Sequence, residues 1–293
     1  MATQDMCSSS STITTKKKQQ QLQEDGFSNT HEERSRCCFE EWMQLQREDL
    51  THLLKSLHQP TNNDTTTTTT TVIRNCISHF EHYISNRTLL AQEHPSPLFA
   101  PTWCTSLENS LLWMAGCRPS IFIRLIYALT SCSSEPLITN DDDNKNGNNT
   151  VTSIGELSPS QMTRVNGLHM RTIKAEEKLT SELASWQEEL ADEPIALIAA
   201  KGDCGDEVVL NNMMNEEAEM ALKEHEKVMG KVIGKADELR LNTMKELVLE
   251  ILKPTQALQF LVASKKLHLS LHQWGKRRDE KQRRIRCYHS ISH

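Results

Sequence analysis

Two histidines near the C-terminal end of the chain, His268 and His272, have the residue type and the spacing needed to bind a metal ion. Residues four apart on a helix lie one turn from each other, so both imidazole rings project from the same side. This arrangement suits chelation of one transition-metal ion. It does not suit two axial ligands on opposite sides of one haem iron. One histidine can still supply a single axial ligand while the other supports or replaces it. A histidine pair at a helix interface with no ligand is the alternative interpretation.

The segment that follows this pair is strongly basic. Residues 276–286 contain seven Lys and Arg against Asp279 and Glu280. Such a segment is typical of a nuclear import signal or of a phosphate-contacting tail, and equally of a solvated helix end. The whole chain has 33 Lys and Arg against 39 Asp and Glu, a net charge of −6. Because affinity for phosphate comes from clustered cations, direct DNA binding is doubtful and would have to be local.

No sequence motif indicates catalysis. The chain contains no GxGxxG, Walker, GxSxG or HExxH motif, and its nine cysteines include no CxxC pair. We therefore expect no enzymatic activity, no catalytic residue, no metal site built on cysteines and no disulfide framework. Glu108 and Arg118 are polar residues in an apolar stretch, and we expect them to form a buried brace between two helices. Reduced thiols, the absence of a membrane span and the absence of an apolar signal core predict a protein of the nucleus and cytoplasm, away from membranes.

The elements that position these residues are predicted to be helices. The chain has only 10 Gly and 9 Pro, and its aromatic content of 5% is low for a β-sandwich or barrel. Apolar residues at spacings of three and four predict helices over 37–57, 72–94, 158–190, 216–253 and 255–281. Ser158, Pro159 and Gln161 form a capping-box signature at the start of the third of these helices. The predicted fold is all-α, an elongated antiparallel bundle of long helices.

Three further segments complete the predicted organisation. Residues 1–36 are polar and read as a disordered tail, and residues 282–293 read as a basic C-terminal tail. Within the helical domain over 37–281, loop insertions are expected at about 60–71, which includes a run of seven threonines, and at about 133–153. Between them, two helices starting at Trp103 and after Pro119 are expected to meet at a tight corner.

One stretch of this corner resembles a known family signature. The residues that carry the resemblance are Trp103, Glu108, Asn109, Trp113, Gly116, Arg118 and Pro119. They resemble the signature of the plant Delay of Germination family, whose members control seed dormancy. Segments 39–46, 156–161 and 254–275 add to the resemblance, which covers about 37–279. The same domain forms the C-terminal part of TGA-type bZIP factors, but no basic region with a zipper precedes it here, so the chain looks like the stand-alone form.

The resemblance implies a non-enzymatic regulator of dormancy, germination and abscisic acid signalling that acts through protein–protein contact. It implies type 2C protein phosphatases as partners, with the contact near the residues Phe39, Glu40, Glu41, Trp42 and Gln46. It also implies haem as a cofactor, with His268 and His272 on the family's histidine pattern. The alternative is a transcription-associated regulator that joins DNA-bound complexes. The choice between haem and a simple metal ion stays open, and so does self-association.

Overall fold

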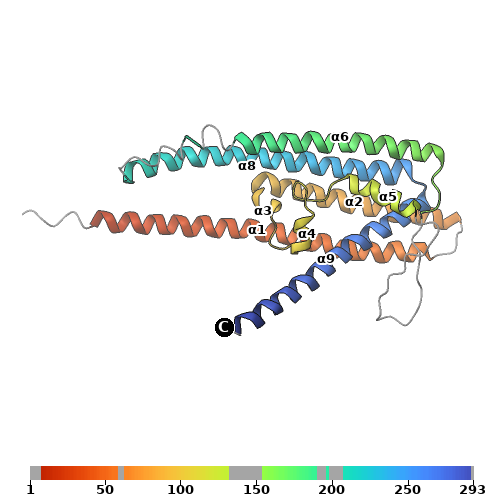
Figure 1. The fold of residues 1–293 in the computed structure, drawn as a ribbon, viewed down its shortest axis with the longest axis horizontal. Helices are drawn as coiled ribbons and strands as arrows, with labels where there is room; N and C mark the ends of the chain where they lie inside the picture. The colour runs from red at the N-terminus through yellow and green to blue at the C-terminus, as the bar shows by residue number, and fades with distance from the viewer. Residues whose placement is uncertain (1–7, 59–62, 132–153, 190–195, 198–206, 292–293) are drawn as a thin grey trace, which may run out of the picture.

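The chain folds as an elongated antiparallel bundle of long helices, and the all-α prediction is confirmed (Figure 1). The structure is a computed structural model that describes residues 8–58, 63–131, 154–189, 196–197 and 207–291. The predicted insertion at 133–153 lies outside these residues. Within them, no helix is long and apolar enough to cross a membrane.

Helices α1 (Ser8–Leu57) and α2 (Asn63–Glu93) run antiparallel and pack along each other. Their apolar residues point inward at the predicted helical period, and α1 ends where the sequence predicts.

Two predictions about the flanking segments were wrong. Residues 8–36 are helical instead of disordered, since this stretch is rich in Gln, Lys and Glu, which favour helix, and has no proline.

The threonine run is also helical, as the first part of α2, and forms no loop insertion. Threonine is a weak helix former, but its hydroxyl can bond a carbonyl one turn back. Here the Thr71 hydroxyl donates to the Thr67 carbonyl at 2.9 Å, and Thr69 is buried. Packing of this turn against the bundle therefore outweighs the low intrinsic propensity.

Between α2 and residue 131, where this part of the described chain ends, lie the short helices α3 (Ser96–Phe99), α4 (Ser106–Ser110) and α5 (Ser120–Ser131). The tight corner is confirmed, but the helix before it is only the five residues of α4. The chain leaves the helical conformation because Met114 and Ala115 have left-handed backbone angles, φ 46° and φ 62°. Trp113 and Gly116 then pair across this turn, with N–H to carbonyl distances of 2.6 and 3.1 Å.

The second half of the bundle is α6 (Pro159–Glu189), α8 (Glu207–Lys245) and α9 (Pro254–Ile291). The capping box at Ser158 is confirmed: its N–H donates to the Gln161 side chain at 3.1 Å, and the Gln161 N–H donates to its hydroxyl at 3.2 Å. A π-helical turn, η2 (Glu246–Ile251), joins α8 to α9. The hydrogen bonds that continue from α8 through this turn end before Pro254, which has no backbone N–H to donate.

The main hydrophobic core lies where α1, α2, α5, α6, η2 and α9 meet, and includes Leu53, Ile123, Val165, Leu247 and Phe260. One end of each of the helices α1, α8 and α9 lies outside this core. The first half of α1, the first part of α8 and the last part of α9 extend beyond the bundle (Figure 1). The basic segment predicted as a tail is therefore the last part of α9, whose helix continues to Ile291.

Candidate functional site

The turn between α4 and α5 is fixed by a buried arginine of α8. Arg240 donates hydrogen bonds to the carbonyls of Trp113 at 2.5 Å, Met114 at 3.0 Å and Cys117 at 2.7 Å. A Cβ atom at position 116 would lie 2.9 Å from the Arg240 Cζ atom, so only glycine leaves room for the guanidinium. The left-handed backbone of this turn is thus held from outside by one side chain.

A second arginine and an aspartate complete this brace. Arg87 of α2 donates to the Ala115 carbonyl at 2.5 Å. Asp237 of α8 accepts from Arg240 at 2.5 Å and lies 3.4 Å from an Arg87 nitrogen. All three side chains are buried, with Asp237 at 0% exposure. The brace ties α2, α8 and the turn together, and it uses residues that the sequence pattern did not single out.

The predicted brace between Glu108 and Arg118 was wrong. Arg118 is half exposed, and its nearest carboxylate is Glu176 of α6 at 3.9 Å. Glu108 instead closes a capping box with Thr105 at the start of α4. Backbone N–H groups at helix starts need acceptors, so Glu108 caps α4 and Glu176 accepts from the Ser120 N–H at the start of α5. This local demand keeps Glu108 from pairing with Arg118.

Glu108 also fastens α4 to α9. Its two carboxylate oxygens lie 2.9 and 3.1 Å from the Nδ1 atom of His272. Two turns further along α9, Asp279 accepts from the Ser106 N–H at 3.0 Å. Between these contacts, a Cβ atom on Gly275 would overlap the Thr105 side chain. The two helices therefore touch closely, and the predicted ligand His272 is held by a carboxylate.

Beside this contact lies a cavity of about 300 Å³ between α1, α2, α5 and α9. Its wall is mostly apolar. Among the lining residues are Cys38, Trp42, Gln46, Cys104, Lys265 and His268. His268 thus faces the cavity, whereas its predicted partner His272 contacts Glu108 and lies edge-on to Phe39, with ring centres 5.9 Å apart. The structure gives the two histidines different surroundings although they are one turn apart.

The side chains of the wall are mostly in their uncharged forms. Burial lowers the pKa of His268 to about 4, so its imidazole is neutral and keeps a free lone pair at neutral pH. Burial raises the pKa of the Cys38 thiol to about 11 and that of the Cys104 thiol to about 12. Neither thiol is therefore a thiolate at neutral pH. Of these side chains, the His268 imidazole is the strongest available ligand for a metal.

The segment predicted to contact a partner, residues 39–46, has one face turned inward and one face exposed to solvent. Phe39, Trp42 and Gln46 face inward, with Trp42 stacked on Tyr83 at a ring distance of 4.5 Å. Glu40 and Glu41 are exposed on the outer face of α1. One face of the segment is thus part of the cavity wall, and the other is open to a partner.

The other signature residues have structural contacts. The Trp113 indole donates to the Thr180 hydroxyl at 3.1 Å, and the Asn109 amide donates to the Pro101 carbonyl at 3.2 Å. Trp103 packs on a small cluster between α2 and α8, and Pro119 is buried just before α5. The signature therefore specifies how the chain turns beside the cavity.

Sequence reasoning missed a second buried ion pair at the cavity. Lys265 of α9 lies 2.9 Å from Asp49 of α1, and Asp49 also lies 2.8 Å from His79 of α2. The Lys265 ammonium is 5.5 Å from the centre of the Trp42 ring. A signal was present, because Asp49 stands on the apolar face of α1 between Trp42 and Leu53, where a charge needs a partner.

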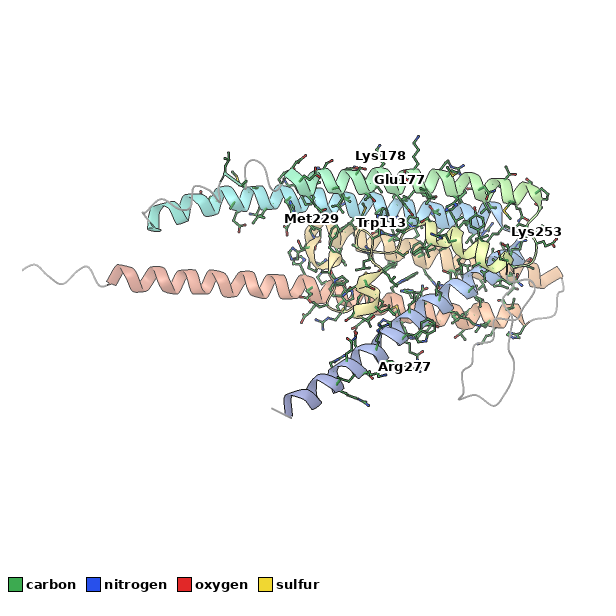
Figure 2. All side chains as sticks on the ribbon, viewed as in Figure 1. Trp113, Glu177, Lys178, Met229, Lys253 and Arg277 are labelled. Carbon is green, nitrogen blue, oxygen red and sulfur yellow. The ribbon has the colours of Figure 1, made fainter. Side chains whose placement is uncertain are left out.

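The basic segment of α9 is open to solvent over the described side chains. Figure 2 shows Arg277 on the part of α9 that extends past the bundle. The exposed basic residues there are Lys276, Arg277, Arg278, Lys281, Arg283 and Arg284. Trp274 is also 54% exposed on this helix. This part of the molecule offers positive charge to a partner and makes no contribution to the cavity.

The chain is similar to a known protein family and to several known proteins. The family model described as DOG1, seed dormancy control, matches residues 49–128, which include the turn and the start of α5. The chain is similar to Protein DOG1-like 1 of Arabidopsis thaliana, with 38% identity over 87% of this chain and 93% of that protein.

Two more distant Arabidopsis thaliana proteins are also similar to the chain. Protein RESPONSE TO ABA AND SALT 1 is 26% identical over 68% of this chain and 74% of its own length. Transcription factor TGA10 is 26% identical over 60% of this chain but only 32% of its own length. The second likeness is partial, as expected for a domain within a longer factor.

Proposed function

The chain belongs to the DOG1 seed dormancy control family, and on that premise we propose that it regulates dormancy and abscisic acid signalling by binding other proteins, without catalysing a reaction. The observation that carries the proposal is the likeness to Protein DOG1-like 1, which extends over 93% of that protein. The name of the relative RESPONSE TO ABA AND SALT 1 supports the link to abscisic acid. Action in the nucleus and cytoplasm stays a prediction.

The proposed partners are clade A type 2C protein phosphatases, and the proposed contact is the outer face of α1. Glu40 and Glu41 are exposed there, while Phe39, Trp42 and Gln46 are turned toward the cavity. A partner that docks on α1 therefore meets two adjacent carboxylates first. Such exposed charges act mainly on the association rate and on partner choice.

The first prediction concerns these two carboxylates. The double variant Glu40→Lys and Glu41→Lys should weaken binding to a purified clade A type 2C phosphatase by about tenfold, because two charges at the contact are reversed. The measurement is the equilibrium affinity by biolayer interferometry, with phosphatase activity as a second readout. Glu188→Lys, which reverses an exposed charge on α6, is the matched control and should bind as the wild type does. Equal binding by the double variant would move the contact away from α1.

Haem is a proposed ligand of the cavity, and the residues present fit it. His268 faces the cavity with a neutral imidazole, and the surrounding apolar wall suits a porphyrin. His272 is held by Glu108, so it is suited to a supporting role and not to binding the same iron from the other side. When bound, haem would give the regulator an iron centre that responds to redox state and to diatomic gases.

The second prediction separates the two histidines. Haemin added to the purified chain should produce a saturable, shifted Soret band, and His268→Ala should abolish it. His272→Ala should weaken haemin binding by roughly tenfold, because loss of a supporting residue typically costs that much. His52→Ala, on the exposed face of α1, is the control and should leave the titration unchanged. If His268→Ala binds haemin as the wild type does, the cavity is not the haem site.

A second candidate function is supported by the basic segment of α9 and by the likeness to TGA10. In this role the chain joins DNA-bound complexes and regulates transcription. If the purified chain alone binds duplex DNA, and its affinity falls steeply with rising salt, direct DNA association is favoured over phosphatase binding. Self-association also stays a prediction, and sedimentation of the purified chain tests it.

A further inference from the structure

The cavity between α1, α2, α5 and α9 has the size and the wall of a small-molecule site. Its volume of about 300 Å³ is at the lower end of the range of roughly 300–1,000 Å³ that is usual for ligand pockets. Aromatic and aliphatic side chains form most of the wall, among them Phe39, Trp42, Ile77 and Phe80. Ligand pockets are typically apolar in this way, with a few polar groups that orient the ligand.

One polar group of the wall lacks a partner. The Gln46 side chain lines the cavity and is only 4% exposed, yet its Nε2 atom has no hydrogen-bond partner among the described residues. A buried donor without an acceptor destabilises the folded state, so such groups are rare in folded proteins. An acceptor on a ligand inside the cavity would satisfy this amide.

The charges of the wall leave no excess for an ion to neutralise. Lys265 is paired with Asp49 at 2.9 Å, and Arg87 and Arg240 share Asp237. Glu108 also lines the cavity and is engaged by Thr105 and His272. The wall and the residues directly behind it thus hold three cations and three carboxylates in all. Because an ionised ligand would enter this apolar space without a counter-charge, the wall favours an uncharged one.

We propose that this cavity binds an uncharged, compact, mostly apolar molecule that carries a single carbonyl group. The Gln46 amide donates a hydrogen bond to that carbonyl, and the aromatic wall packs around the rest of the molecule. This site goes beyond the proposed regulatory function and does not depend on it. It does not require haem, since the residue that selects the ligand is Gln46 on α1 and not His268 on α9, and the two ligands would compete for the same cavity.

Two uncharged dyes test the site by fluorescence titration of the full chain. Prodan is a naphthyl ketone and offers the carbonyl, whereas phenylnaphthylamine has a similar size and no carbonyl. Wild-type protein should bind both dyes, one molecule per chain. Gln46→Leu should weaken prodan binding by roughly tenfold, the loss expected for a buried hydrogen bond, and should change phenylnaphthylamine binding by no more than about twofold.

Two further variants make the test specific. Gln44→Leu makes the same chemical change on the exposed face of α1 and should leave both titrations unchanged. Ser264→Phe adds a ring in the wall on α9 and should prevent binding of both dyes, while circular dichroism shows that each variant is still folded. The proposal is overturned if prodan does not bind saturably, if Gln46→Leu affects both dyes equally or neither, or if folded Ser264→Phe binds the dyes as the wild type does.

Discussion

Replacing Asp237 by alanine is expected to lower the free energy of unfolding by about 3–5 kcal/mol. The carboxylate is 0% exposed and is the counter-charge of two buried guanidinium groups, those of Arg87 and Arg240. Its removal leaves two buried cations with only carbonyl acceptors, and a buried charge that loses its partner is strongly destabilising. The measurement is urea unfolding followed by circular dichroism.

The adjacent residue provides the control for this substitution. Glu238 is the next residue of α8 and is exposed, so Glu238→Ala should change the free energy of unfolding by no more than about 0.5 kcal/mol. Since Arg240 also holds the turn at Met114 and Ala115, Asp237→Ala should in addition expose the Trp113 indole, which tryptophan fluorescence would record. Equal stability of the two variants would mean that the carbonyl acceptors alone are enough for the arginines.

The helices themselves were predictable because their signals are local. The capping box at Ser158 and the apolar period after it depend on residues within a few turns of each other, and the structure confirms both. Predictions based on composition were less successful. The threonine run reads as a loop by propensity, but burial of Thr69 and the backbone bond of Thr71 make it helical.

The site was less predictable because its contacts join residues far apart in the chain. Glu108 and Arg118 are polar residues of one apolar stretch, which suggested that they pair, whereas Glu108 meets His272 across the α4–α9 contact. Likewise, the spacing of the histidines shows that they share a face of α9, but not that only His268 reaches a cavity. The cavity wall is assembled from the long helices α1, α2 and α9, the short helix α5 and the turn, and no local pattern encodes it.

Substitution of two glycines one turn apart on α8 should have opposite effects. Gly230 lies where α8 crosses α2, and a Cβ atom there would be 2.6 Å from the Ala91 carbonyl oxygen. Because that neighbour is backbone, Gly230→Ala must push the two helices apart, at a cost of about 1–3 kcal/mol. Gly234 has room, since the nearest atom to its Cβ would be the Thr88 methyl at 3.7 Å. Gly234→Ala should therefore gain the helix propensity of alanine, up to about 1 kcal/mol.

The expected difference between the two variants is thus roughly 1–4 kcal/mol in the free energy of unfolding, measured by urea titration under identical conditions. Both substitutions make the same change in propensity and in the entropy of the unfolded chain, so the comparison isolates the contact between α2 and α8. If Gly230→Ala were as stable as Gly234→Ala, α8 would not approach the α2 backbone in solution. Arg87 and Asp237, which lie on these two helices, would then have to bridge a wider gap, and the brace that holds the turn would lose its basis.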